Sequence, residues 1–375
     1  MSTNQLIYAI SEHNADLRYL TNFLAADAFV YLKLKGKSYL LLYDLEVDRG
    51  RRQASVDGVL AISDLQTEYK RRHKKPGTVA DLIAMVCGNR GVKKLQVPAS
   101  FPIGMAMQLN QLGLTLLPQP EPFAKARLVK KKWELAEIAR VQTANQKAMA
   151  AAYNLLREAD IRHKDQSLFI GSQPLTAEYV RQAIDLVLLK ENCLVLNTIV
   201  ACGAQTADPH ERGSGPLFAG QSIVVDIFPS SRTSGYFGDM TRTFCKGKAP
   251  DKLKRLYDTV HHGQALALKH VCAGVDPKVP DRKVRDYFAK AGYPTKKQAG
   301  HMVGFFHGTG HALGLQIHEP PYMSPRGQGL LKAGMVITVE PGLYYPWGSV
   351  RIEDLVVVTK TGLRNLTSFP KVLEL

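Results

Sequence analysis

Cysteines are few in this sequence, and long apolar runs are absent from it. Its 375 residues include 5 cysteines, an odd number, and no two of them form a C-x-x-C pair. Such scattered thiols argue against a disulfide framework and against a thiolate metal site. No apolar run approaches the roughly 18 residues that a membrane span needs, and the first residues lack the basic and apolar regions of a secretion signal. We therefore expect a cytoplasmic protein without membrane contact, in which any metal would be bound by oxygen and imidazole.

Acidic residues are scarce relative to basic ones, since 33 Asp and Glu against 49 Lys and Arg give a formal charge of +16. The densest basic run is KRRHKK, at residues 70–75. Such a charge can indicate an anionic partner, but a solvated basic surface gives the same composition. No zinc-finger or RNA-recognition signature accompanies the run, and aromatic residues do not interleave with it. We therefore expect no nucleic-acid partner.

The first 123 residues alternate short apolar segments with a helical pattern. A helix is expected to open at Thr78, a favourable N-cap residue, and to close at Gly88. The segment KLKGKSYLLL indicates a tight hairpin around Gly36, so part of the sheet is expected to be antiparallel. Strands are predicted at residues 6–10, 28–34, 38–43, 58–62 and 94–98. This alternation predicts an α/β domain over residues 1–123.

A change of composition marks the expected domain boundary. PQPEP, at residues 118–122, precedes a basic segment and a long amphipathic helix from about Lys131 to Glu158. Further helices are expected after Thr176 and within residues 251–270 and 281–292, with hairpin-like strands between and after them. The sequence therefore predicts an α+β domain over residues 124–375, in which helices cover an antiparallel sheet.

Two apolar hairpins in this second domain each carry a pair of acids. In SIVVDIFPSSRTSGYFGDMTRTF, a turn near Arg232 and Thr233 would place Asp226 opposite Asp239, with Cβ atoms about 5 Å apart. In GMVITVEPGLYYPWGSVRIEDLVVV, the same separation of 13 residues would place Glu340 opposite Glu353. Paired carboxylates in apolar strands repel one another and are costly to bury. A cation bound between them removes both costs.

The histidine segment FFHGTGHALGLQIHEPP lies between the two hairpins. Its glycines argue against a helix, and in an extended segment His307 and His311 would share a face about 13 Å apart, so only one of them can be a ligand. His311 is favoured because small residues flank it. Strand alternation puts His318 on the opposite face unless a bulge intervenes, so the spacing leaves its position open.

Four carboxylates and one imidazole form an oxygen-rich donor set. Four like charges are too many for one divalent ion and suit two, which can share a water molecule and polarise a carbonyl group. Hard oxygen ligands favour Mn²⁺, with Co²⁺, Fe²⁺ and Zn²⁺ as alternatives.

These segments together resemble a known family. VVVDIFP with GYFGDMTRTF, FFHGTGHALGLQIHE, TVEPGLYY and VRIEDLVVV are similar, in this order, to motifs of the proline-specific branch of the pita-bread metallopeptidases, which includes aminopeptidase P and prolidase. The resemblance covers roughly residues 124–375, and the first 123 residues resemble the creatinase-type N-terminal domain more loosely. It implies a pita-bread domain with a curved antiparallel sheet covered by helices. It also implies a dinuclear metal site formed by Asp226, Asp239, His311, Glu340 and Glu353.

The resemblance implies further roles and a reaction, hydrolysis of the peptide bond before proline. His210 would line the substrate pocket, His318 would stabilise the oxyanion, and His307 would help to bind proline. Glu340 would carry the proton to the proline nitrogen, and Arg351 would pair with carboxylates of the metal site. The family is commonly dimeric, so a homodimer is expected. The separation of Asp226 from Asp239 is two residues longer than in the family pattern, an even insertion that keeps the face of each acid.

Two questions stay open from the sequence. A dipeptidase and an aminopeptidase differ in how the site receives the residues after proline, and no feature of the sequence decides between them. A non-catalytic pita-bread module that binds peptides or nucleic acid is the alternative function. All five ligand positions are filled by metal-binding residue types, which favours the enzyme.

Overall fold

A computed structural model describes residues 3–194 and 197–375 of the chain. The chain divides into two compact units, Met1–Arg127 and Leu128–Leu375. The expected boundary after residue 123 lies in the segment that precedes this division. Among the described residues, no helix has the length and apolar composition needed to cross a membrane.

The N-terminal unit is built on a six-stranded mixed sheet in the order β4-β3-β2-β1-β5-β6. The strands predicted from the apolar segments are all present, and β2 and β3 form the antiparallel hairpin expected around Gly36. Gly36 has φ 91°, a left-handed conformation that favours glycine in a tight turn. The strands are β1 (Gln5–Ala9), β2 (Phe29–Leu34), β3 (Lys37–Leu42), β4 (Gly58–Ala61), β5 (Lys94–Pro98) and β6 (Thr115–Gln119).

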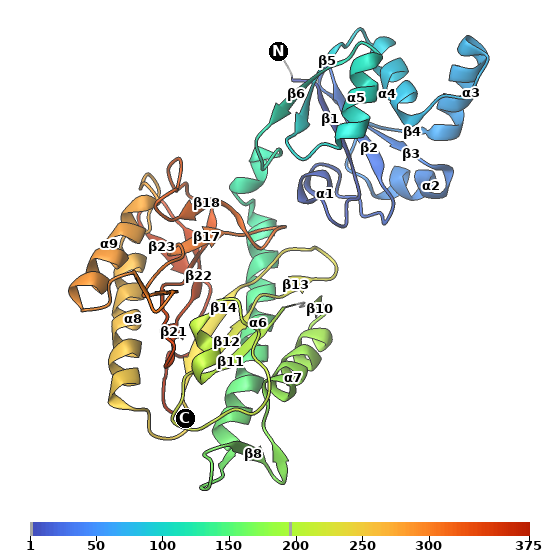
Figure 1. The fold of residues 1–375 in the computed structure, drawn as a ribbon. Coiled ribbons are helices and arrows are strands. Elements are labelled where there is room, and N and C mark those ends of the chain that lie inside the picture. Colours follow the sequence, from blue (N-terminus) through green and yellow to red (C-terminus); the bar gives the residue numbers. More distant parts are fainter. Residues whose placement is uncertain (1–2, 195–196) are drawn as a thin grey trace. The chain divides into compact units, whose positions relative to one another are not determined.

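Helices cover both faces of this sheet (Figure 1). The core on one face includes residues of α3, α4 and α5, and the core on the other includes residues of α1 and α2. The expected helix after Thr78 is α4, and it ends at Gly88 as predicted. The helices are α1 (Ala15–Thr21), α2 (Asp44–Gln53), α3 (Ile62–His73), α4 (Val79–Gly88) and α5 (Ile103–Gln111).

The start of α4 provides a test of the local sequence signal. Thr78 accepts a hydrogen bond from the Asp81 N–H at 3.2 Å, and the Asp81 carboxylate accepts one from the Thr78 N–H at 2.7 Å. We expect Thr78→Ala to cost about 1 kcal/mol, because alanine lacks the hydroxyl that accepts from the Asp81 N–H and donates to the Asp81 carboxylate at 2.8 Å. Chemical unfolding should show this loss. Thr67→Ala in α3, whose hydroxyl donates to the Ser63 carbonyl of the same helix, is the control. An equal loss of stability there would refute the capping explanation.

The C-terminal unit consists of two halves, each with an antiparallel sheet and two long helices (Figure 1). In the first half, α6 and α7 pack against the sheet β11-β12-β14. In the second, α8 and α9 pack against the sheet β18-β17-β19-β22-β23. The long helices are α6 (Lys132–Glu158), α7 (Ala177–Lys190), α8 (Asp251–Lys269) and α9 (Lys278–Lys290). All four match helices predicted from the sequence, although α9 begins before the expected residue 281.

The sheets of the two halves are joined where β14 contacts β21 and β22. The sheet strands are β11 (Ile199–Cys202), β12 (Ile223–Ile227), β14 (Met240–Phe244), β17 (Gly310–Ala312), β18 (Glu319–Met323), β19 (Val336–Val339), β22 (Asp354–Val358) and β23 (Leu363–Asn365). Short strands complete the unit: β7 (Asp160–Ile161), β8 (Leu168–Ile170), β9 (Gln173–Pro174), β10 (Cys193–Leu194), β13 (Ser230–Ser231), β15 (Lys296–Gln298), β16 (His301–Val303), β20 (Gly342–Leu343) and β21 (Val350–Arg351).

Candidate metal centre

The first pair of acids lies on the sheet β11-β12-β14. The expectation that Asp226 lies directly opposite Asp239 is wrong: Asp226 pairs with Thr241, and Asp239 precedes β14. The same register continues through the bridge between Ser230 and Phe237, so the turn is centred one residue later than expected. Moving the centre by one residue moves each partner by two, and an even shift preserves the face of the acid. Both acids therefore still line the same cavity.

The second pair lies on the sheet of the other half. Strands β19 and β22 pair in the same register as β20 and β21 beyond a short break, and this shared register places Glu340 opposite Glu353, as the sequence predicts. The backbone fixes both acids, since the Glu340 N–H donates to the Thr309 carbonyl at 2.8 Å and the Glu353 N–H donates to the Thr241 carbonyl at 3.1 Å. The latter bond joins the two halves beside the site.

His311 occupies the middle of β17, and its N–H donates to the Thr338 hydroxyl at 3.0 Å. The His311 Nε2 atom lies 3.3 Å from Glu340 Oε1 and 3.7 Å from Asp239 Oδ2. His318, which strand alternation could not place, returns to this side: its ring centre is 4.4 Å from that of His311. The reason is that β17 ends at Ala312, and the chain reaches His318 through a non-strand segment rather than an alternating one.

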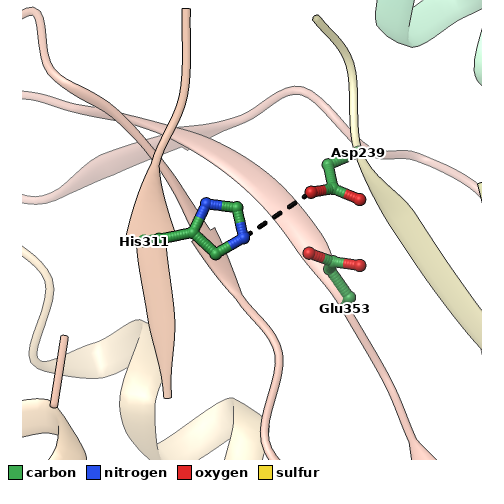
Figure 2. A group of neighbouring side chains, drawn as sticks. All are labelled: Asp239, His311 and Glu353. Atoms are coloured by element: carbon green, nitrogen blue, oxygen red, sulfur yellow. Dashed lines mark ion pairs between the residues drawn. The ribbon is translucent and has the colours of Figure 1, made fainter. Parts of the chain in front are cut away.

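Three of the five predicted ligands form a compact group. Asp239, His311 and Glu353 come from three different segments and point toward one another (Figure 2). Each offers one ligand atom, and these atoms all lie within 4.8 Å of one another. Glu340 lies beside His311, and Asp226 completes the set from β12. The five residues therefore converge on one cavity.

The acids of this group are crowded and buried. Burial raises the pKa of Asp239 well above its usual value, and the carboxylates of Glu353, Asp226 and Glu340 raise it further. Burial also raises the pKa of Glu340 to about 7, and burial together with the carboxylates of Glu340 and Asp226 raises the pKa of Glu353 well above its usual value. Burial lowers the pKa of His311 to about 3, so its imidazole is neutral, the form that binds a metal.

This arrangement fits a divalent metal ion. Asp226 has one oxygen, Oδ2, 2.7 Å from Arg351 Nη2, whereas its buried Oδ1 atom has no hydrogen-bond partner in the part of the chain that the structure describes. A buried carboxylate oxygen without a partner costs free energy that a cation recovers. The oxygen-rich donors with one neutral imidazole suit a transition metal with a preference for oxygen.

Arg351 is held behind Asp226 by a polar network. Its guanidinium donates to the Tyr344 hydroxyl at 2.9 Å, to the Thr241 hydroxyl at 3.2 Å and to the Pro209 carbonyl at 3.2 Å. The Tyr344 hydroxyl in turn lies 2.8 Å from His307 Nε2. Arg351 therefore orients an acid of the site, and Tyr344 connects it to the histidine expected in the proline pocket.

The cavity above these acids has a volume of about 960 Å³, and all of its lining residues belong to the C-terminal unit. His210, His307 and His318 line it together with the five predicted ligands and Arg351. His210 lies on an exposed loop, whereas His307 is held by Tyr344. All nine residues singled out from the sequence thus border one space.

The sequence reasoning missed the residues that orient the acids from behind. Gln142 of α6 receives the Asp239 N–H at 2.9 Å and donates to the Asp239 carbonyl at 2.9 Å. Its only signal was a polar side chain among the buried residues of α6, a signal that Glu134 and Asn145 share. Tyr344 carried no comparable signal, because a tyrosine in an apolar strand is ordinary.

Comparison with known proteins places the chain in a family. Residues 136–360 match the model of metallopeptidase family M24. The chain is 30% identical to the Xaa-Pro dipeptidase of Pyrococcus horikoshii over 284 residues, and this aligned region is 74% of each chain. It is 41% identical to the uncharacterized peptidase YqhT of Bacillus subtilis over 176 residues, only 47% of either chain.

Solved structures extend the likeness to nearly the whole chain. The Xaa-Pro dipeptidase of Bacillus anthracis has a TM-score of 0.81 at 25% identity and covers 99% of this chain and 95% of its own. The X-Pro aminopeptidase of Thermotoga maritima has the same TM-score at 22% identity, and the match covers 100% of this chain and 97% of that chain. At this low identity the match shows the fold alone. The chain therefore belongs to metallopeptidase family M24, and it is a peptidase with the pita-bread fold.

Proposed function

We propose that this protein hydrolyses the peptide bond that precedes proline, with two divalent ions bound by Asp226, Asp239, His311, Glu340 and Glu353. The observation that carries this proposal is the convergence of four carboxylates and one neutral imidazole on a single cavity. The names of the Pyrococcus horikoshii and Bacillus anthracis relatives support the choice of Xaa-Pro substrates. Mn²⁺ is the proposed ion because oxygen donors predominate.

The ions would supply an activated water molecule and a positive charge for the attacked carbonyl oxygen. The residues of the chain act around this chemistry. His318, next to His311 in the cavity, donates a hydrogen bond to the oxygen as its negative charge develops. Glu340 carries a proton to the proline nitrogen, which cannot leave the tetrahedral carbon unprotonated. His210 and His307 bind the peptide on either side, and Arg351 keeps Asp226 in place.

The test measures proline release from an Xaa-Pro dipeptide and cleavage of an Xaa-Pro-Yaa tripeptide by chelated protein and by protein reloaded with Mn²⁺. We expect turnover of at least one substrate with Mn²⁺ and none after chelation, because the carboxylates alone cannot activate water in this way. Asp226→Asn is the control, and it should remain inactive with Mn²⁺. Failure on both substrates with Mn²⁺, Co²⁺, Fe²⁺ and Zn²⁺ would favour the non-catalytic binding module.

A further inference from the structure

The loop that carries His210 is held by many contacts although it has little regular structure. It spans residues 208–215, between the 3₁₀ turn Gly203–Ala207 and the bridge from Thr176 to Pro216. Asp208, His210 and Arg212 of this loop line the cavity. A peptide that enters the site therefore meets side chains whose positions depend on this loop.

Two side chains of α7 form hydrogen bonds with the backbone of this loop. The Arg181 Nη1 atom donates to the Arg212 carbonyl at 2.7 Å and to the Gly213 carbonyl at 2.9 Å. Both carboxylate oxygens of Glu178 lie 3.2 Å from the Gly215 nitrogen, whose N–H donates to them. Arg181 and Glu178 also form an ion pair at 3.3 Å. Neither side chain lines the cavity, so their contacts serve the loop rather than a ligand.

The loop also lies directly against β11. The Val200 N–H donates to the Arg212 carbonyl at 3.0 Å, so this one carbonyl is shared by the strand and Arg181. Gly213 has φ +75°, and a Cβ atom there would lie 1.9 Å from the Val200 carbonyl oxygen. The loop is thus bonded to both β11 and α7.

The loop also reaches the metal centre. The Pro209 carbonyl, next to His210, accepts a hydrogen bond from Arg351 Nη1 at 3.2 Å. Arg351 holds Asp226 through its other terminal nitrogen. His210 therefore lies between an anchor at the metal site and an anchor on α7. Loss of the α7 side-chain bonds would loosen one end of the loop, which the Val200 N–H would still hold, and leave the metal-site anchor intact.

We propose that Glu178 and Arg181 are positioning residues that hold His210 at the rim of the cavity in the orientation that binds the peptide. The proposal rests on the proposed function, since it concerns binding of the same substrate. The proposal gives α7, which carries both residues outside the cavity, a role in substrate affinity. Because the metal-site acids do not contact these two residues, the role is in binding rather than in the chemical step.

The kinetic test compares variants of the full-length, Mn²⁺-loaded protein. Arg181→Met is expected to raise KM for an Xaa-Pro dipeptide about tenfold while kcat changes less than about threefold, because two hydrogen bonds to the loop are lost but the reacting groups remain. Arg181→Lys should recover part of the affinity, since an ammonium can still donate to one carbonyl. Arg51→Met is the matched control: Arg51 forms an i,i+3 pair with Asp48 on α2 but holds no loop, and KM should not change.

A second measurement follows the loop itself. Hydrogen exchange of residues 208–215 should accelerate at least about tenfold in Arg181→Met and in Glu178→Ala, with or without metal, because the anchoring bonds are lost. Melting temperature and bound-metal stoichiometry should stay near those of the unmodified protein. Unchanged exchange, an unchanged KM, or a fall in kcat as large as the rise in KM would overturn the proposal. If the unmodified protein cleaves no Xaa-Pro peptide, the proposed function fails. The exchange data would still decide whether Glu178 and Arg181 hold the loop in place.

Discussion

Replacing Asp239 by asparagine is expected to lower turnover of an Xaa-Pro dipeptide by about a thousandfold or more. Asp239 is buried, and it lies in the compact group with His311 and Glu353. An amide carries no charge, so the variant loses several kcal/mol of the attraction that fixes a cation at this position. Initial rates in Mn²⁺, together with the number of ions bound per chain, measure the effect.

The same substitution should not lower the stability of the metal-free protein. Without an ion, burial and the carboxylates of Glu353, Asp226 and Glu340 all disfavour a charge on Asp239, which is why its pKa is raised. Asparagine removes that cost, so chelated Asp239→Asn should melt at or above the temperature of the chelated unmodified protein. Added Mn²⁺ should then raise the melting temperature much less in the variant.

Asp286→Asn is the control, because Asp286 is an exposed acid of α9 and does not line the cavity. It should leave turnover, ion stoichiometry and the Mn²⁺-dependent rise in melting temperature unchanged. A variant of Asp239 that keeps both full turnover and the full Mn²⁺-dependent rise would show that this acid is not a ligand.

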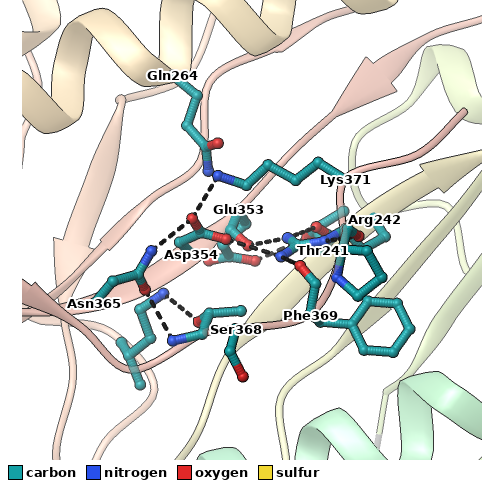
Figure 3. Close-up of polar contacts among 12 residues, drawn as sticks. Thr241, Arg242, Gln264, Glu353, Asp354, Asn365, Ser368, Phe369 and Lys371 are labelled. Atoms are coloured by element: carbon teal, nitrogen blue, oxygen red, sulfur yellow. Dashed lines mark hydrogen bonds and ion pairs between the residues drawn. The ribbon is translucent and has the colours of Figure 1, made fainter.

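Replacing Asp354 by alanine is expected to cost about 3–5 kcal/mol of folding free energy, the largest stability effect that we predict for a single residue. Asp354 is fully buried directly after Glu353 in the chain. Its carboxylate accepts from Arg242 at 2.9 Å, from Lys371 at 2.6 Å and from Asn365 at 2.9 Å (Figure 3). Alanine would leave the buried guanidinium of Arg242 without its counter-charge.

The contacts of Arg242 explain why Asp354→Ala should also affect the metal centre. Its guanidinium donates to the Glu353 carbonyl at 2.6 Å and to the Phe369 carbonyl at 2.8 Å, which ties the C-terminal segment to the strand that carries a proposed ligand (Figure 3). Asp354→Ala should therefore weaken Mn²⁺ binding as well as lower stability, by roughly the 10–100-fold typical of outer-shell partners. Denaturant unfolding and metal titration measure the two effects.

Lys371→Met provides the comparison. Lys371 contacts the same carboxylate, but its side chain is 21% exposed, so its charge is partly solvated and its loss should cost about 1 kcal/mol or less. Equal losses in the two variants would mean that the buried Arg242–Asp354 pair is not the source of the stability. An Asp354→Ala protein as stable as the unmodified chain would refute the argument directly.

The sequence by itself determined the elements and the chemical character of the site. Short apolar runs predicted β1 to β5 of the N-terminal sheet but not β6, and Thr78 predicted the start of α4, because these signals depend on residues close together in the chain. Acids interrupting apolar strands indicated a bound cation, since burial penalises them wherever the strands lie. The family resemblance identified from four motifs was confirmed by the match over residues 136–360.

Only the tertiary structure decided several contacts at and around the site. The turn after β12 is centred one residue later than expected, so Asp226 pairs with Thr241. His318 reaches His311 because the chain leaves the strand after Ala312, an event that strand alternation cannot predict. Gln142 reaches Asp239 across 97 residues of sequence, and Glu178 and Arg181 reach the His210 loop across more than 30. Such contacts form when packed elements bring distant backbone groups within hydrogen-bonding distance, and local patterns carry no information about that packing.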